Sequence, residues 1–209
     1  MNEARQPRIG VLGSGKGSNF EAIAQACAEG RLHAEIALVI SDVPEAGILA
    51  KAKARGIRAV YLDPGRYRTR LDESAERRYV QTLKEAGVEY VVLAGFMRIL
   101  HEVFLESFPG RIVNIHPSLL PAFPGLKAWE QALNYGVKVT GVTIHLVDAG
   151  VDTGPILAQE AVPVLDEDTP ETLHARIQEV EHRLYPAVIE DWVHGKFEVQ
   201  GRRVLRRKG

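Results

Sequence analysis

The sequence predicts an α/β fold: an open, mostly parallel, twisted sheet with helices on both faces. Along the first two-thirds of the chain, strand-length apolar runs alternate with segments of helical period, and the runs are continuously apolar, as in strands buried on both faces. This alternation is typical of βαβ units. After about residue 136 two long apolar stretches are joined by a short loop, which predicts an antiparallel extension in the C-terminal third.

The expected elements follow in chain order. The buried strands are residues 9–12, 36–40, 59–62, 90–94 and 112–115, and the antiparallel pair is 137–147 with 156–164. Two early helices present single apolar faces, made of Phe20, Ile23, Ala24 and Cys27 in the first and Leu71, Ala75, Tyr79 and Leu83 in the second. A long helix begins at Thr169 and Pro170 and reaches Trp192. We expect Pro186 to kink or interrupt it, and residues 197–205 to form a hairpin around Gly201.

Length and composition exclude several classes of protein. The chain has 209 residues, a single Cys and a formal net charge of −1, so we expect one domain over residues 1–209 and no disulfide framework. No apolar run is long enough for a membrane span or a signal peptide, and there is no global basic field to attract nucleic acid. We therefore expect a cytoplasmic protein without membrane or nucleic-acid partners.

A glycine-rich turn follows the first expected strand and precedes a helix. Residues 13–19 (GSGKGSN) let backbone amides approach a ligand, and the helix start adds a positive partial charge. The spacing matches neither a Walker A loop nor a dinucleotide fingerprint. The sequence therefore indicates a phosphate site in the turn at residues 13–19, with a plain tight turn capped by Ser18 or Asn19 as the alternative.

Polar residues end the strand at 112–115. Asn114 and His116 are two apart and point the same way, and a carboxamide beside an imidazole suits oxyanion stabilisation and proton transfer. The turn-rich loop further along the chain offers two carboxylates, Asp148 and Asp152, and a carboxylate that reaches the imidazole would orient it. One alternative is that His116 is a structural residue. Another is a zinc site made of His116, His145 and Asp152, but the sequence lacks the ligand spacing typical of such sites. A third is a serine hydrolase, but the sequence lacks the nucleophile-elbow motif of that class.

The sequence resembles the phosphoribosylglycinamide formyltransferase family, folate-dependent enzymes of purine synthesis, over nearly its whole length. Four stretches carry the resemblance: residues 15–19 (GKGSN), 93–100 (LAGFMRIL), 114–121 (NIHPSLLP) and 150–155 (GVDTGP). One departure is that Lys127 and Trp129 follow Pro124 and Gly125 where the family often carries a histidine.

The resemblance assigns roles to residues of this chain. It implies a catalytic trio of Asn114, His116 and Asp152. It implies substrate contacts at Gly17, Ser18, Asn19, Met97, Pro117 and Glu181, and folate contacts at Arg98, Ile99, Leu100, Asn114, Val147 and Asp152. It implies a further contact from Arg70 to the phosphate or the folate. The implied layout is a phosphate-binding half at about 1–100, a folate-binding and catalytic half at about 101–195, and a terminal hairpin at about 196–209.

The implied reaction is transfer of a formyl group from 10-formyltetrahydrofolate, as co-substrate, to the amine of a phosphoribosylated glycinamide, giving the N2-formyl product without a metal. We expect a monomer or homodimer. The alternatives are formyltetrahydrofolate deformylase and methionyl-tRNA formyltransferase, whose additional domains do not fit before residue 9 or after about 196. An alternative of another class is a silent phosphometabolite-binding module.

Overall fold

A computed structural model describes residues 5–207 and divides the chain into two compact units, Met1–Ile112 and Val113–Gly209. Seven strands form one mostly parallel sheet, hydrogen-bonded in the order β3-β2-β1-β4-β5-β6-β7, and two more strands form a separate hairpin. The predicted fold class is therefore confirmed. The single-domain expectation and its internal boundaries stay predictions.

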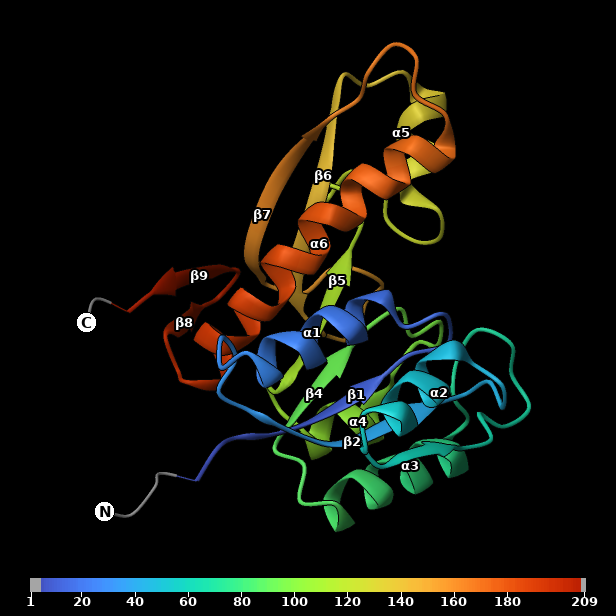
Figure 1. Cartoon of the computed structure of the whole chain (residues 1–209), viewed down its shortest axis with the longest axis vertical. Helices are drawn as coiled ribbons and strands as arrows, with labels where there is room; N and C mark the ends of the chain where they lie inside the picture. Colours follow the sequence, from blue (N-terminus) through green and yellow to red (C-terminus); the bar gives the residue numbers. More distant parts are fainter. Residues whose placement is uncertain (1–4, 208–209) are drawn as a thin grey trace. The chain divides into compact units, whose positions relative to one another are not determined.

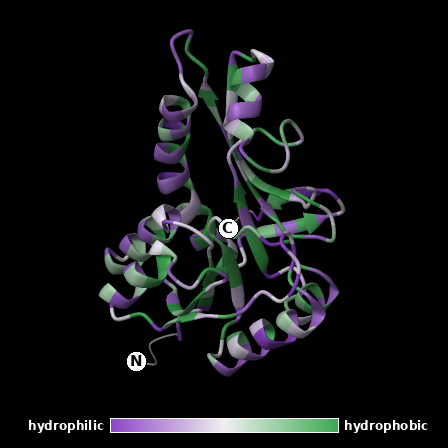
Figure 2. Ribbon diagram, turned by 90° about the vertical axis from the view of Figure 1, so that its right-hand side faces the viewer, coloured by the Kyte–Doolittle hydropathy of each residue, from purple (hydrophilic) through white to green (hydrophobic). Residues whose placement is uncertain are grey.

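The first unit contains a parallel sheet built from alternating strands and helices (Figure 1). Its elements are β1 (Arg8–Leu12), α1 (Ser18–Ala28), β2 (Glu35–Ser41), α2 (Gly47–Ala54), β3 (Ala59–Tyr61), α3 (Glu73–Glu85), β4 (Tyr90–Leu93) and α4 (Glu102–Ser107). Strand β1 pairs in parallel with β2 and β4, and β2 pairs in parallel with β3. Helix α1 packs against α2 and α3 against α4, with helices on both sides of the largely hydrophobic strands (Figure 2).

The strands of this unit form where the apolar runs predict them, within one residue at each end. Burial explains this agreement, since Ile9, Val11 and Leu12 in β1 and Val91 and Val92 in β4 are completely buried. Parallel pairing brings the carboxyl ends of β1, β2 and β4 together, so the loops that follow these strands are neighbours.

The second unit is built on antiparallel strands. Its elements are β5 (Ile112–His116), α5 (Ala128–Tyr135), β6 (Val139–Leu146), β7 (Ile156–Pro163), α6 (Pro170–Val193), β8 (Phe197–Gln200) and β9 (Arg203–Arg206). Strand β6 pairs antiparallel with both β5 and β7, and β8 pairs antiparallel with β9. The predicted antiparallel extension and terminal hairpin are confirmed.

Helix α6 lies along β6 and β7 (Figure 1). Thr169 caps its start, where its hydroxyl accepts from Thr172 N–H, as predicted. The helix is continuous through Pro186, so the expected interruption there is wrong, and the alternative expectation of a kink stays a prediction. Pro186, Val188 and Ile189 are buried, and this packing offsets the hydrogen bond that proline removes.

Within residues 5–207 no helix combines the length and apolar character that crossing a membrane requires.

Candidate functional site

The glycine-rich loop of the first unit is tied down at three points. Gly13 N–H donates to the Ile40 carbonyl at 3.1 Å, Ser14 N–H to the Gly95 carbonyl at 3.0 Å, and the Gly15 carbonyl accepts from Ile48 N–H at 3.1 Å. A Cβ added at Gly13 would lie 2.7 Å from the Ala94 carbonyl oxygen. Glycine is therefore required where the loop passes between its neighbours.

Gly17 is the N-cap of α1. Its φ of 77° is in the left-handed region, and an added Cβ would lie 2.8 Å from Ile48 Cα. No side chain caps this helix, so the alternative in which Ser18 or Asn19 acts as the cap is wrong. The predicted phosphate residues Gly17, Ser18 and Asn19 thus form the start of a helix. Because no side-chain cap satisfies the backbone N–H groups there, this helix start favours binding of an anion.

The segment after β4 is joined to this loop through a buried carboxylate. Asp42 accepts from Ser14 Oγ at 2.5 Å and from Arg98 Nε at 2.6 Å, and its side chain is only 2% exposed. Met97 N–H in turn donates to Ser14 Oγ at 2.9 Å. Asp42, which the sequence did not single out, therefore couples the predicted phosphate loop to the predicted folate segment.

The guanidinium of Arg98 is engaged by the protein itself. Besides Asp42 it donates to the carbonyl oxygens of Tyr67, at 2.7 Å, and Arg68. Ile99 N–H donates to the Thr69 carbonyl at 2.9 Å, next to an isolated parallel bridge between Arg70 and Ile99. Residues 97–100 are thus held against the loop at 66–71.

The side chains in this region differ widely in exposure. Met97 is 54% exposed, Ile99 is half-buried and Leu100 is buried. The guanidinium of Arg70 lies over the ring of Tyr67, 4.2 Å from its centroid.

In the second unit, Asn114 and His116 lie on β5 as predicted, and each has a partner on β6. Asn114 is opposite His145, and Asn114 Nδ2 lies 3.4 Å from His145 Nε2. His145 Nδ1 is 2.8 Å from the Leu146 carbonyl, which can only accept, so Nδ1 carries a proton and Nε2 accepts from the Asn114 amide. The sequence suggested His145 only as a zinc ligand and missed this contact, which depends on strand register.

His116 is buried, and the loop after β5 fixes its tautomer. Nε2 lies 2.8 Å from the Phe123 carbonyl, so Nε2 carries a proton. Nδ1 faces Asp152, whose Oδ2 is 3.5 Å away. The structure therefore brings His116 and Asp152 together, and Nδ1 is the nitrogen that can gain or lose a proton.

Asp152 lies between two imidazoles. Its Oδ1 is 3.7 Å from His145 Nε2, and its Oδ2 accepts from Gly125 N–H at 2.8 Å. Its φ of 54° is left-handed, a conformation in which Asp is several-fold enriched relative to most residues. The backbone strain and the Gly125 contact both serve to aim this carboxylate.

Burial lowers the pKa of His116 below its ordinary value, against the Phe123 carbonyl and the Asp152 carboxylate, which raise it, while His145 lowers it further. Burial raises the pKa of Asp152, but the neighbouring His145 side chain, the Gly125 N–H and the charge of His116 together bring it below its ordinary value. Asp152 is therefore ionised at neutral pH, and His116 in the unliganded protein is mostly neutral.

The remaining predicted residues of this unit lie near strand ends or on α6. Pro117 directly follows β5, and Val147 directly follows β6; both are half-buried. Glu181 is buried on α6, one turn before Tyr185, whose hydroxyl donates to the Val113 carbonyl at 3.2 Å.

Trp129, where the sequence departs from the family pattern, stacks on His174 of α6. The ring centroids are 3.7 Å apart and the planes differ by 1°. The stack joins α5, which follows the loop after β5, to α6.

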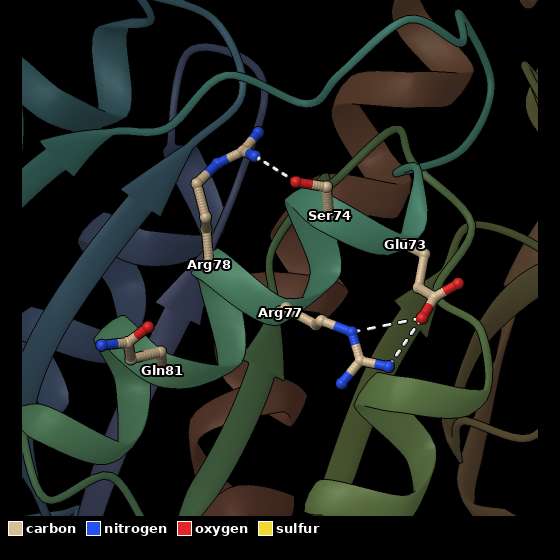
Figure 3. A pocket seen from close by; sticks show the side chains of 5 residues that line it. All are labelled: Glu73, Ser74, Arg77, Arg78 and Gln81. Atoms are coloured by element: carbon tan, nitrogen blue, oxygen red, sulfur yellow. Dashed lines mark hydrogen bonds and ion pairs between the residues drawn. The ribbon is translucent and has the colours of Figure 1, made fainter.

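A hollow on the surface of α3 contains none of the predicted site residues (Figure 3). Its polar groups pair within the helix: Arg77 with Glu73 at 2.6 Å, and Arg78 with Ser74 at 2.8 Å. Arg78 also donates to the Asp63 carbonyl at 3.1 Å. Such exposed pairs one turn apart are typical of a solvated helix face.

Among the described residues 5–207, no three His, Cys, Asp or Glu side chains gather so as to hold a metal ion.

Comparisons with known proteins show which family the chain resembles. The formyl transferase family model matches residues 7–189. A phosphoribosylglycinamide formyltransferase from Bacillus subtilis is 43% identical over 183 residues, which is 88% of this chain and 93% of that protein. The crystal structure of glycinamide ribonucleotide transformylase 1 from Symbiobacterium toebii is 48% identical with a TM-score of 0.92, and the match covers 97% of this chain and 95% of that one.

A formyltetrahydrofolate deformylase from Pseudomonas syringae pv. tomato is also similar in structure, with a TM-score of 0.89 at 25% sequence identity. That match covers 98% of this chain but only 67% of the deformylase. The family match over most of the chain, and the identity to relatives over nearly their full length, show that the chain belongs to the formyl transferase family.

Proposed function

We propose that this chain transfers the formyl group of 10-formyltetrahydrofolate to the amine of N1-(5-phospho-D-ribosyl)glycinamide, a step of purine biosynthesis. The observation that carries the proposal is the buried pair His116 Nδ1 and Asp152 Oδ2, 3.5 Å apart, with Asn114 on the same strand. The 43% identity to the Bacillus subtilis enzyme over nearly its full length supports the choice of substrate.

The first unit supplies binding groups for both substrates. The start of α1 at Gly17, Ser18 and Asn19 holds the phosphate, because backbone N–H groups and the helix dipole stabilise an anion there. Exposed Met97 offers an adaptable apolar surface where the two substrates meet.

Arg98, Ile99 and Leu100 bind the folate. Because the guanidinium of Arg98 donates to Asp42 and to two carbonyl groups, we assign its contribution to the main chain rather than to a charged contact. Asp42 then acts by holding this segment in place.

The second unit supplies the chemistry. Asn114 donates one amide N–H to His145 and keeps the other for the oxygen of the formyl group as that oxygen becomes negative. His116 stabilises the same oxygen through Nδ1 once that nitrogen is protonated, and Asp152 stabilises the resulting imidazolium. Asp152 also accepts the amine's proton through water and returns it by the same route to N10 of the folate, as the bond between N10 and the formyl carbon breaks and tetrahydrofolate leaves. Holding two substrates in line supplies much of the acceleration, without a covalent intermediate on the protein.

Three further residues complete the proposed contacts. Glu181 contacts the glycinamide end of the nucleotide, Pro117 lines the meeting point of the substrates, and Val147 contacts the pterin.

One assay separates this proposal from its alternatives. The wild-type protein is mixed with 10-formyltetrahydrofolate and either the glycinamide ribonucleotide, water alone or methionyl-tRNA, and loss of the formyl group is followed by absorbance. We expect turnover with the ribonucleotide only. Equal turnover without an acceptor would indicate a deformylase, turnover only with tRNA would indicate a tRNA formyltransferase, and binding without turnover would indicate a silent module.

The role of Asn114 is tested in the same assay. Loss of one oxyanion donor lowers kcat by about 10²- to 10³-fold, so Asn114→Ala is expected to show that loss with an unchanged melting temperature. An Asn114→Ala variant with wild-type turnover would contradict the mechanism.

A further inference from the structure

The proposed mechanism does not use a cluster of buried hydroxyl groups on β6 and in the loop after β5. Thr143 on β6 and Ser118 in the loop after β5 are completely buried. Buried hydroxyl groups are costly unless they are hydrogen-bonded, so the partners of these two side chains show what the cluster holds in place.

Thr143 is the hub of the cluster. Its Oγ1 donates to the Ser118 carbonyl at 2.7 Å and accepts from Leu120 N–H at 3.0 Å and from Gln159 Nε2 at 2.9 Å. One donor and two acceptors are all that a hydroxyl offers, so every hydrogen-bonding position of Thr143 is used. Gln159 adds a second bond, from Nε2 to the Leu120 carbonyl at 2.9 Å.

Ser118 carries the connection along the loop to His116. Its Oγ lies 2.6 Å from the Ala122 carbonyl and 3.3 Å from the Phe123 carbonyl. Phe123 has a φ of 53°, a left-handed conformation that a bulky residue keeps only when its surroundings impose it. The Phe123 carbonyl held in this way is the acceptor for His116 Nε2, 2.8 Å away.

We propose that Thr143, with Ser118 and Gln159, is a positioning residue that fixes the tautomer of His116 by holding the Phe123 carbonyl in place. The carbonyl keeps the proton of the neutral imidazole on Nε2, and Nδ1 is left as the atom that takes up a proton. If the loop loosens, the neutral imidazole can place its proton on Nδ1 instead, and Nδ1 then has no lone pair with which to take up a proton. The inference rests on the proposed function only in assigning His116 a part in formyl transfer.

The test compares Thr143→Val with Thr143→Ser. Valine keeps the shape of threonine but removes the hydroxyl, whereas serine keeps the hydroxyl, so the pair isolates the hydrogen bonds. In ¹⁵N-histidine-labelled protein, long-range ¹H–¹⁵N spectra report the tautomer of His116 directly, and His145, which also faces Asp152, is an internal reference.

We expect Thr143→Ser to keep the wild-type tautomer and to retain kcat within about twofold. We expect Thr143→Val to give a mixture of the two His116 tautomers. We expect kcat to fall by about 10- to 100-fold, the range for loss of groups that orient a reacting residue, and KM for each substrate to change less than about threefold. A Thr143→Val variant with the wild-type tautomer and wild-type kcat would overturn the proposal.

Gln159→Glu provides a second variant if Thr143→Val fails to fold. Gln159 is largely exposed, and glutamate has the same shape but cannot donate to Thr143 or Leu120, so the same tautomer change is expected, more weakly. Retention of the wild-type tautomer and kcat in Gln159→Glu would count against the network. The spectra can be recorded without any catalytic turnover. Absence of formyl transfer in the wild type would therefore refute the proposed function, and the tautomer of His116 in the variants would still decide this inference.

Discussion

Replacing Asp152 with Asn removes a negative charge beside His116 while preserving the shape of the side chain. Asn is among the non-glycine residues that adopt the left-handed conformation found at this position, φ 54°. Its amide oxygen can still accept from Gly125 N–H, now 2.8 Å from Oδ2, and its NH₂ group can donate to His145 Nε2, now 3.7 Å from Oδ1. The variant therefore tests the charge of Asp152 rather than its packing.

The geometry sets the size of the effect. His116 Nδ1 and Asp152 Oδ2 are 3.5 Å apart, and the two side chains are 6% and 12% exposed. Unit charges at this distance attract by about 5 kcal/mol at an effective dielectric constant of roughly 20, and a nearby opposite charge typically moves a pKa by about 1–3 units. Asp152 raises the pKa of His116, which burial lowers, so the Asn variant lowers that pKa further. Above the pKa, any such lowering makes the imidazolium rarer in direct proportion, tenfold for each pH unit.

The assay is the pH dependence of kcat for formyl transfer, which reports groups in the enzyme–substrate complex. If the imidazolium is the active form, kcat falls as pH rises through the pKa of His116. In Asp152→Asn we expect that fall to begin at a lower pH and kcat near pH 7 to drop by about 10- to 1,000-fold, the range for loss of a neighbouring opposite charge. Asp166→Asn is the matched control, since it makes the same charge change at a carboxylate that is 86% exposed. Wild-type kcat with an unshifted profile in Asp152→Asn would refute the assigned role.

Two further predictions concern stability. Gly17→Ala forces a Cβ to within 2.8 Å of Ile48 Cα at a φ of 77°, so we expect the free energy of unfolding in urea to fall by at least about 1–2 kcal/mol. Gly15→Ala is the control, because its Cβ meets nothing within 4 Å, and it should unfold like the wild type. Burial lowers the pKa of His174 below 6.5 in the folded protein, so the native state favours the neutral ring. The neutral ring therefore contributes stability above pH 6.5, and this contribution is lost as the pH falls through the lower pKa of the folded state. His174→Gln should therefore lose less melting temperature than the wild type on acidification below 6.5, an outcome that replacement of the exposed His33 should not reproduce.

The strands could be predicted from the sequence because burial on both faces leaves a continuous apolar run, and such runs fix the start and end of β1, β2 and β4 to within a residue. Pro186 shows the limit of local rules. Proline removes one helical hydrogen bond, at a cost of about 3 kcal/mol, but α6 buries Tyr185, Val188 and Ile189 around it. Each such side chain contributes about 1.5–3 kcal/mol when buried, so packing along β6 and β7 decides the outcome.

The site was predicted residue by residue, but its hydrogen-bond partners were not. Periodicity places Asn114 and His116 on one face of a strand, and the family resemblance adds Asp152. The contact between Asn114 and His145 depends on the register of β5 with β6, and the strands are separated by a long loop that contains α5. The Phe123 carbonyl acts through a backbone conformation that no side-chain pattern encodes. Asp42 follows β2 as an ordinary strand-end carboxylate, and only the positions of Ser14 and Arg98 reveal its role.

The tautomers of the two imidazoles beside Asp152 suit the proposed mechanism. Backbone carbonyls of Phe123 and Leu146 hold opposite tautomers, with a proton on Nε2 of His116 and on Nδ1 of His145. Nδ1 of His116 therefore faces Asp152 Oδ2, and Nε2 of His145 accepts from the Asn114 amide. A proton on His116 Nδ1 leaves the Asn114 contact intact and places the imidazolium beside a carboxylate, which stabilises it. In the proposed mechanism His116 is therefore protonated without disturbing the Asn114 amide, whose second N–H stabilises the developing negative charge.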